Sequence, residues 1–340
     1  MNLKFLLSSL ILLVGCVSLA DFDIPIGAAV FDEPTPTDTV TTLQEDAQLE
    51  VHFCPQENCS QLFMDFLGND EKHCALYELN KPELIEFLNR ENVQLVVDQD
   101  SEEDVIAMKN VVIDTGGGLM HNKFCVAGDR VFTGSMNPTV NDITKNNNNI
   151  VLLRSAEIAA LYETEFQELW NHSRNRKSER NSFLIDGTPV SIYFCPEDDC
   201  AAKIISEIEK AQREIYFMTF SFTHDGITDA VLSRFEQNVT VKGVFETRQI
   251  TEYEPYELFL SKGMDVRKDG NKNTMHHKLW IVDSLCVITG SMNPTKNGDE
   301  RNDENLLIIC DKDIAAQYLE EFWRVYNEAI AAAQTDDDKS

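Results

Sequence analysis

The stretches Gly134-Ser-Met-Asn-Pro-Thr139 and Gly290-Ser-Met-Asn-Pro-Thr295 decide the fold of this chain, because they are identical and lie 156 positions apart. Ahead of each stands a shorter match, His121-x-Lys123 and His276-x-Lys278, at an offset of 155. Matches that recur in the same order at nearly the same offset predict an internal duplication. We therefore interpret the chain as two copies of one structural unit.

The duplication reaches well beyond these motifs. Val51–Cys59 matches Ile192–Cys200 around a Cys-Pro-x-x-x-Cys loop, and Ile158–Phe166 matches Ile314–Phe322 in a helical pattern. Within each copy, short apolar strands alternate with amphipathic helices. This alternation predicts an α/β layered fold for each copy.

Composition along the chain predicts six segments. They are a signal peptide at 1–20, a flexible stalk at 21–46, the first copy at 47–172, a linker at 173–187, the second copy at 188–332 and an acidic tail at 333–340. The signal peptide is expected because the apolar run Phe5–Val14 follows Lys4 and is short for a bilayer span. It ends either at a lipobox whose Cys16 becomes lipidated or at an ordinary cleavage site after Ala20. Both alternatives predict export.

The overall composition restricts the class of partner. Hydrophobic residues make up 43% of the chain, which excludes disorder along its whole length. Lys and Arg number 29 against 58 Asp and Glu, for a formal net charge of −29. A charge this negative argues against generic binding to a nucleic-acid backbone, although a local basic pocket is compatible with it.

The cysteines are interpreted in the light of export. Cys54 with Cys59, and Cys195 with Cys200, could each close a small disulfide loop or bind a metal. No further ligands stand at zinc-like spacing, so disulfides are favoured, without a connectivity that the sequence can fix. Four other cysteines fall in or beside apolar stretches and are interpreted as buried thiols: Cys74, Cys125, Cys286 and Cys310.

The His-x-Lys pairs carry the chemistry. Residues i and i+2 of a strand point to the same face, so each pair would present an imidazole beside an ammonium group. The Gly-Ser-Met-Asn turn that follows each pair adds hydroxyl and amide groups. One nucleophile or acid, surrounded by groups that hold anionic oxygens, suits a phosphate ester.

These residues resemble the phospholipase D superfamily, whose mark is His-x-Lys-(x)4-Asp followed by Gly-Ser-x-Asn, twice per active site. The resemblance covers nearly all of residues 47–330, and each copy is similar to the short cardiolipin-hydrolase and bacterial-endonuclease branch. It implies two α/β sandwich halves related by a pseudo-twofold axis, with the active site between them. Because both motifs lie in one chain, a monomer would suffice.

The resemblance also implies roles for the motif residues. One histidine would attack phosphorus to form a phosphohistidine, and the other would protonate the leaving alcohol. The phosphate would be held by the lysines together with Ser135, Asn137, Ser291 and Asn293. Because the lysines take the place of a metal ion, neither a metal nor a cofactor is expected.

The copies differ in two places. The motif aspartate is Asp283 in the second copy, whereas the first copy has Gly128 at that position and Asp129 one residue later. Glu304 follows His276 by 28 residues, where the resemblance implies a carboxylate that binds the imidazole, but the matching residue of the first copy is Asn148. A carboxylate favours the imidazolium form. We therefore expect His121 to be the nucleophile and His276, oriented by Glu304, the general acid.

These features predict an exported phosphodiesterase that hydrolyses phospholipids, since export, a possible lipid anchor and the acidic charge favour lipid over nucleic acid. Transfer of a lipid headgroup would differ only in the alcohol that resolves the intermediate. An endonuclease acting on DNA or RNA is the alternative within the family. An inactive phosphate-binding surface protein is the alternative outside catalysis, suggested by Gly128 and Asn148.

Overall fold

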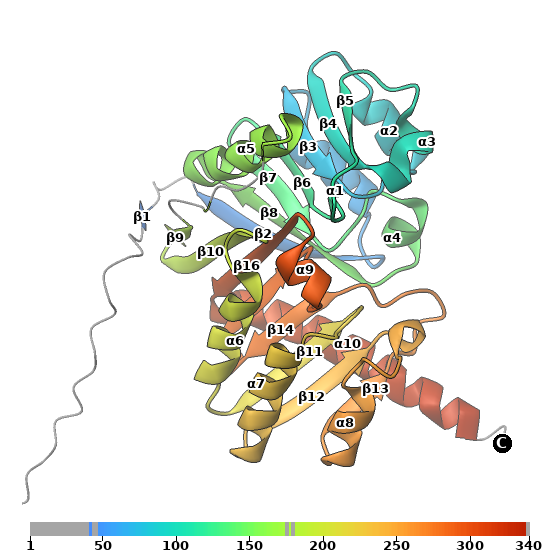
Figure 1. Ribbon diagram of the computed structural model, residues 1–340, viewed down its shortest axis with the longest axis vertical. Coiled ribbons are helices and arrows are strands. Elements are labelled where there is room, and N and C mark those ends of the chain that lie inside the picture. The colour runs from blue at the N-terminus through green and yellow to red at the C-terminus, as the bar shows by residue number, and fades with distance from the viewer. Residues whose placement is uncertain (1–40, 43–46, 174–176, 178–180, 338–340) are drawn as a thin grey trace, which may run out of the picture. The chain divides into compact units, whose positions relative to one another are not determined.

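Each copy of the duplication forms a mixed sheet with the same order of strands, in a computed structural model that describes residues 41–42, 47–173, 177 and 181–337. The first sheet has seven strands in the order β2-β8-β7-β6-β3-β4-β5. The second repeats this order as β10-β16-β15-β14-β11-β12-β13 and is extended by β9 and β1 to nine strands. In Figure 1 the first copy runs from blue to green and the second from yellow-green to red.

The elements of the first copy follow the predicted alternation. Its strands are β2 (Gln48–Cys54), β3 (Lys72–Leu76), β4 (Val93–Asp98), β5 (Val111–Asp114), β6 (Lys123–Ala127), β7 (Arg130–Gly134) and β8 (Asn148–Arg154). Its helices are α1 (Cys59–Leu67), α2 (Pro82–Leu88), η1 (Gln99–Ser101), α3 (Glu102–Val105), α4 (Val140–Thr144) and α5 (Ala156–Trp170).

The second copy repeats the series element by element. Its strands are β10 (Thr188–Cys195), β11 (Glu214–Thr219), β12 (Thr240–Phe245), β13 (Asp265–Lys268), β14 (Lys278–Val282), β15 (Cys286–Gly290) and β16 (Glu304–Cys310). Its helices are α6 (Cys200–Lys210), α7 (Asp225–Glu236), η2 (Thr247–Gln249), α8 (Tyr256–Ser261), α9 (Lys296–Glu300) and α10 (Lys312–Asp337). The predicted α/β fold with two tandem halves is confirmed.

Three predicted segments contain regular structure. Strand β1 (Thr41–Thr42) lies in the expected stalk and pairs in parallel with β9 (Ser182–Ile185), which lies in the expected linker. Helix α10 continues to Asp337, inside the expected acidic tail. The predicted signal peptide and the lipidation candidate Cys16 lie outside the described residues. Among the helices that the structure describes, none is long and apolar enough to cross a membrane.

One core joins the two copies. It contains α5 and α10 together with the face of each sheet that these helices cover, while α1 and α2, and likewise α6, α7 and α8, pack on the opposite faces over separate cores (Figure 1). Two equivalent aromatic pairs cross the junction: Phe53 meets Tyr318 with ring centroids 5.2 Å apart, and Phe194 meets Tyr162 at 5.1 Å. Such edge-to-face pairs contribute about 0.5–1.5 kcal/mol each beyond their burial. Their reciprocity reflects the pseudo-twofold relation of the copies.

All eight cysteines of the described residues are paired. The predicted candidates form two small loops, Cys54–Cys59 and Cys195–Cys200. The interpretation of the other four as thiols is wrong, because they form Cys74–Cys125 and Cys286–Cys310. Each of these pairs joins directly opposed residues of neighbouring antiparallel strands, β3 with β6 and β15 with β16. Such proximity follows from strand register, which cysteine spacing does not reveal.

Candidate active site

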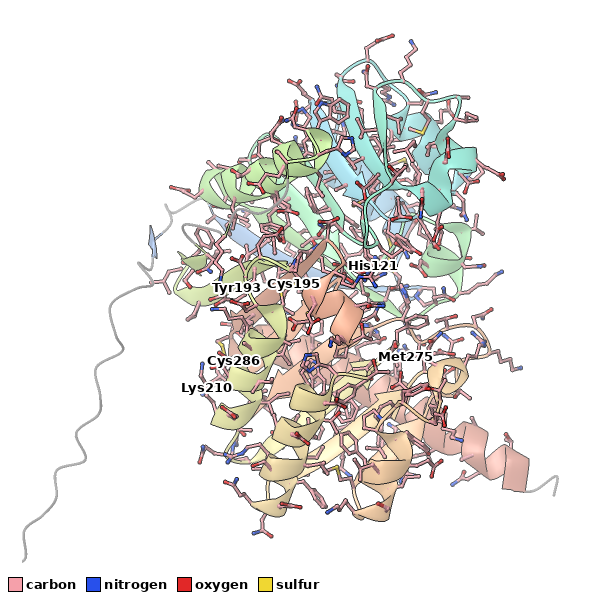
Figure 2. The ribbon with its side chains drawn as sticks, in the orientation of Figure 1. His121, Tyr193, Cys195, Lys210, Met275 and Cys286 are labelled. Carbon is pink, nitrogen blue, oxygen red and sulfur yellow. A yellow bond between two sulfur atoms is a disulfide. The ribbon has the colours of Figure 1, made fainter. Side chains whose placement is uncertain are left out.

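The two motif histidines meet at the junction of the copies because each precedes a strand whose approach segment docks on the other copy. The N–H of His121 donates to the carbonyl of Asp303 at 2.9 Å, and the N–H of His276 donates to that of Asn147 at 2.9 Å. These hydrogen bonds belong to two isolated parallel β-bridges between the copies, which pair Met120 with Asp303 and Asn147 with Met275. Figure 2 places His121 and Met275 along this boundary. The sequence expectation that both motifs share one site therefore agrees with the geometry.

One carboxylate binds the backbone just before each histidine. Asp98, at the end of β4, accepts from the N–H of Met120 at 2.9 Å, and Glu246, directly after β12, accepts from the N–H of Met275 at 2.7 Å. Both carboxylates are almost fully buried. They hold the approach segments in place and do not point at the imidazoles, so their role is architectural.

Glu304 binds His121, not His276. Its Oε2 lies 2.7 Å from His121 Nδ1, and it accepts further bonds from Ser291 Oγ at 2.6 Å and Asn302 Nδ2 at 3.3 Å. The expected pairing with His276 is wrong because the last strand of each copy delivers its first residue across the junction, to the histidine of the other copy. The separation of 28 residues between His276 and Glu304 therefore led to the wrong histidine.

His276 correspondingly receives its partner from the first copy. Its Nδ1 lies 3.0 Å from Asn148 Oδ1, and Ser135 Oγ also donates to this oxygen at 3.0 Å. Because an amide oxygen can only accept, Nδ1 of His276 carries the proton, and Nε2 is left for the substrate. The same tautomer follows for His121 when Glu304 is ionised. The tautomer of His276 is thereby assigned by its partner, whereas that of His121 depends on the protonation of Glu304.

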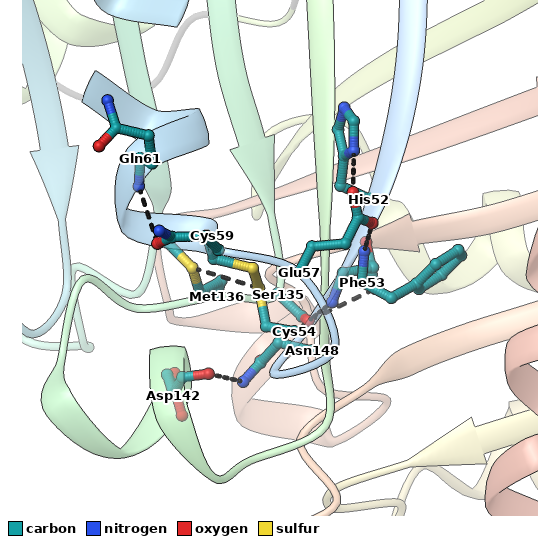
Figure 3. Close-up of a disulfide and its surroundings, with 12 residues drawn as sticks. His52, Phe53, Cys54, Glu57, Cys59, Gln61, Ser135, Met136, Asp142 and Asn148 are labelled. Atoms are coloured by element: carbon teal, nitrogen blue, oxygen red, sulfur yellow. Dashed lines mark hydrogen bonds and ion pairs between the residues drawn. A yellow bond between two sulfur atoms is a disulfide. The ribbon is translucent and has the colours of Figure 1, made fainter. Parts of the chain in front are cut away.

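The serines differ from their expected role. Ser135 and Ser291 were expected to bind phosphate, but their hydroxyls donate to Asn148 and Glu304 and accept from the backbone N–H of Asn149 and Asn305. Their hydrogens are thus used to orient the partners of the histidines. Figure 3 shows Ser135 and Asn148 beside the Cys54–Cys59 disulfide.

Lys123 and Lys278 provide positive charge at the site. Each Nζ donates to the carbonyl of the histidine two residues earlier, Lys123 at 2.6 Å and Lys278 at 2.8 Å. Each also lies 5.0 Å from the centre of an aromatic ring, Tyr77 for Lys123 and Phe220 for Lys278. Both lysines are buried, and burial lowers the pKa of Lys123 to about 8. Since an ammonium group has three donors, each lysine retains capacity for an anion.

Asn137 and Asn293 stand on the turns that follow the motif hairpins. Their Oδ1 atoms are buried and find no hydrogen-bond partner within the described part of the chain. Buried polar groups without partners are uncommon in folded proteins. Because side-chain amides can rotate to present their NH2 groups, both residues fit the expected phosphate-binding role.

The motif aspartates lie outside the site. Asp283 occupies the turn at the end of β14 opposite Lys278, where it accepts from the backbone N–H of Gln212, Arg213 and Glu214 at 2.7–3.0 Å. Asp129 is exposed in the corresponding β6–β7 turn. Each lysine begins a strand of five residues, and the aspartate follows the opposite end of that strand. The structure thus gives Asp283 a capping contact with three backbone amides. A catalytic role for Asp129 and Asp283 stays a prediction.

The electrostatics favour the neutral form of both imidazoles when no phosphate is bound. Burial lowers the pKa of His121 well below its usual range, and Lys123 and Lys278 lower it further. Burial likewise lowers the pKa of His276 to about 4, aided by Lys278 and opposed by Asp142. A phosphate that offsets the lysine charges would raise both pKa values. The arrangement is thus suited to a neutral nucleophile and a second histidine that takes up a proton when phosphate binds.

Sequence analysis missed three residues that touch this machinery. Tyr77 and Phe220 pack against the histidines at an angle, with ring centroids 4.7 Å from His121 and 4.8 Å from His276. Each follows the equivalent strand of its copy, β3 or β11, so aligning the copies through these strands could have found the pair. Asp142 approaches His276, but no motif marks it.

The potential metal ligands do not form a thiolate site. Among the described residues, a cluster of Glu207, Cys286 and Cys310 has ligand spacing. Its two cysteines form a disulfide, as do the four cysteines that sequence analysis considered as ligands. Disulfide sulfurs are not thiolates, so these positions do not have the chemistry of a zinc site.

Comparison with known proteins identifies similar chains. A family described as "Cardiolipin synthase, PLD-like domain" matches residues 74–170 and 204–326, one range in each copy. A phospholipase D of Rickettsia prowazekii is 33% identical over 136 residues, which are 39% of this chain and 66% of that protein. A mitochondrial cardiolipin hydrolase of Xenopus tropicalis is 30% identical over 147 residues, or 41% of this chain and 69% of that protein.

A solved structure shares the tandem architecture. The phosphatidylserine synthase of Haemophilus influenzae Rd KW20 aligns with a TM-score of 0.63, covering 82% of this chain and 85% of its own. Sequence identity is 14%, so this likeness concerns the fold.

Proposed function

Because the chain belongs to the phospholipase D superfamily, we propose that it is a phosphodiesterase that cleaves phospholipids through a phosphohistidine. The observation that carries the proposal is the meeting of two oriented histidines with two buried lysines that retain unused donors. Two cations and two amides suit the oxygens of one phosphodiester, and two imidazoles suit its attack and protonation.

In the first proposed step, Nε2 of His121 attacks phosphorus and the bond from phosphorus to the leaving alcohol breaks. His276, as imidazolium, gives its proton to the alcohol oxygen. The ring of His121 then carries positive charge while Nδ1 remains bonded to Glu304, which stabilises the intermediate. In the second step water attacks phosphorus, its proton passes to His276, and the Nε2–phosphorus bond breaks. Lys123 and Lys278 would balance the phosphate charge throughout.

The assignment of His121 as nucleophile retains our sequence prediction but changes its reason. A carboxylate on Nδ1 stabilises the cationic phosphohistidine, and Glu304 lies on His121 at 2.7 Å. The attack requires Glu304 in its ionised form. Burial raises the pKa of Glu304 to about 8, and the cationic ring that forms on attack would lower this pKa and so favour the carboxylate.

Phospholipid is the proposed substrate class, and an exported monomer with a possible N-terminal lipid anchor is the proposed state. Support comes from the relatives named phospholipase D and cardiolipin hydrolase, and from the net charge of −29. The four disulfides are consistent with an oxidising compartment outside the cytoplasm.

The test is turnover by the 340-residue chain in EDTA, with phosphatidylglycerol, cardiolipin, single-stranded DNA and RNA offered separately. His121→Ala and His276→Ala are compared with His172→Ala, which removes an exposed histidine. We expect lipid turnover that both site variants lose and the control keeps. Turnover of nucleic acid alone would establish the endonuclease alternative. Folded protein without turnover of any substrate would favour the phosphate-binding alternative.

A further inference from the structure

The two histidines differ in the charge of their partners. Glu304 offers His121 a carboxylate, whereas the equivalent residue beside His276 is Asn148, a neutral amide. An amide orients the ring, yet it adds no charge to stabilise an imidazolium. A general acid at His276 would therefore lack the negative charge that Glu304 offers His121, unless another carboxylate lies close to His276.

Asp142 is that group. Its Oδ2 lies 3.4 Å from His276 Nδ1, so this nitrogen faces both Asn148 and a carboxylate. Asp142 belongs to α4, six residues before Asn148, and is only 4% exposed. Asp142 and Glu304 occupy different positions of the repeat. Counting 28 residues from a motif histidine therefore does not find Asp142.

The second copy has no room for a carboxylate side chain at the position equivalent to Asp142. The position equivalent to Asp142 is Gly298, where a Cβ would stand 2.4 Å from the carbonyl oxygen of Asn293. A contact that short excludes any side chain without movement of the backbone. Each histidine is thus matched with one carboxylate, taken from a different position of the repeat.

The local structure holds Asp142 in place as an anion. Its Oδ2 accepts from the N–H of Asn137 at 2.8 Å, and its Oδ1 accepts from Asn146 Nδ2 at 2.7 Å. Burial alone would raise the pKa of Asp142, but His276, Asn146 and the Asn137 amide together hold this pKa below its usual range. The contact with Asn137 also links the carboxylate to a residue of the phosphate site.

We propose that Asp142 is a positioning residue that stabilises the imidazolium form of His276 and so replaces the carboxylate that the repeat lacks at Asn148. This role rests on the proposed function and deepens it. The cations facing His276 are Lys278 and Lys123, which oppose protonation, and Glu78 is a further acidic group near Asp142. Asp142 is the facing carboxylate that favours protonation.

The test starts with Asp142→Asn, which keeps the acceptor for the Asn137 N–H but removes the charge. The imidazole nitrogens of His276 are titrated by NMR with inorganic phosphate as probe, so the readout does not require turnover. We expect the pKa of His276 to fall by roughly one to three units, as for loss of an opposite charge at this range. An unchanged His276 titration would overturn the proposal.

Turnover adds a second readout. If the wild type hydrolyses a phosphodiester, the basic limb of the kcat profile should move to lower pH in Asp142→Asn, because less His276 is protonated at each pH. Adding Asn148→Asp to this variant should return the limb towards its original position, since it restores a carboxylate at His276. A purely structural loss would lower kcat at every pH without moving the limb, and would contradict the proposal.

Two further variants make the result decisive. Asp142→Ser keeps a small hydroxyl acceptor without charge and serves if the asparagine variant fails to fold. Asp299→Asn is the matched control, because Asp299 lies in the equivalent helix α9 but contacts His224 and the N–H of Ala201. We expect it to leave the titration of His276 unchanged. If the wild type turns over no substrate, the NMR titration still tests Asp142 while the proposed function fails separately.

Discussion

The two copies place their histidines in nearly the same frame but surround them with different charges. His121 has a carboxylate at 2.7 Å whose pKa is raised to about 8, whereas His276 has an amide at 3.0 Å and an aspartate at 3.4 Å. Backbone contacts, lysines and aromatic neighbours are repeated on both sides. The comparison teaches that duplication reproduced the frame, while a few substitutions gave the two histidines partners of different charge.

The largest expected effect separates the two histidines by leaving group. His121→Ala should abolish turnover of every phosphodiester, because no nucleophile remains. His276→Ala should lower turnover of alkyl esters by about 10²–10⁴-fold, the usual contribution of a positioned proton donor. It should largely spare release of p-nitrophenol, which needs no proton. Stopped-flow measurement of nitrophenol release tests this, and equal loss in both variants would show that the roles are not divided.

Removal of the Glu304 charge comes next. Glu304→Gln should lower kcat by about 10²-fold, because the cationic phosphohistidine loses its counter-charge. Its pH dependence gives a second check. Burial raises the pKa of Glu304 from 4.5 to about 8, so its contribution to stability is present below pH 4.5 and is lost as pH rises through 8. Relative to the variant, wild-type stability should fall by at most about 1.4 kcal/mol per pH unit in this window.

Chemical denaturation of the two proteins at pH 5, 6, 7 and 8 measures this difference. Asn148→Gln is the matched control, since it changes the equivalent partner without adding or removing a charge. Parallel pH curves for wild type and Glu304→Gln would contradict buried ionisation of Glu304.

The aromatic neighbours should give a smaller effect. Tyr77→Leu and Phe220→Leu each remove a ring that lies 5.0 Å from a lysine ammonium and packs on a histidine. Loss of a partly buried cation–π contact of about 1–2 kcal/mol corresponds to roughly a five- to thirty-fold loss of kcat/KM. Steady-state kinetics check it. Similar losses in both variants would confirm that this part of the frame is symmetric.

The motif aspartates should give the smallest effect on activity. Asp283→Asn removes the charge that caps three backbone amides, so it should lower stability by about 1–2 kcal/mol and leave kcat unchanged. Asp129→Asn, in the exposed equivalent turn, should change neither quantity. Thermal unfolding and kcat measured together test this pair, and a large fall of kcat in either variant would return these residues to the active site.

Sequence alone predicted the frame of the molecule because the frame is local and repeated. The Gly-Ser-Met-Asn turns and His-x-Lys strands fix the tandem α/β architecture, and self-comparison is sufficient to find them. Cys54, Cys59, Cys195 and Cys200 were recognised as disulfide candidates for the same reason, since each pair lies at a sequence separation of 5, although their connectivity stayed open.

The sequence alone could not predict features that depend on contacts between strands far apart in the chain. Cys74 meets Cys125 through the register of β3 and β6, and Glu304 reaches His121 through the crossing of the two copies. Counting residues from His276 gave the correct carboxylate with the wrong partner. Asp142 was missed because its contact with His276 joins different copies at no repeated spacing.

The most direct test of the account is the identity of the phosphorylated residue. The His276→Ala variant is given a 32P-labelled nitrophenyl phosphodiester, quenched in alkali during the first turnover, digested and analysed by mass spectrometry. The account predicts one labelled peptide, carrying phosphohistidine at His121. Labelling of wild-type protein at His276, or turnover without labelling of either histidine, would contradict it.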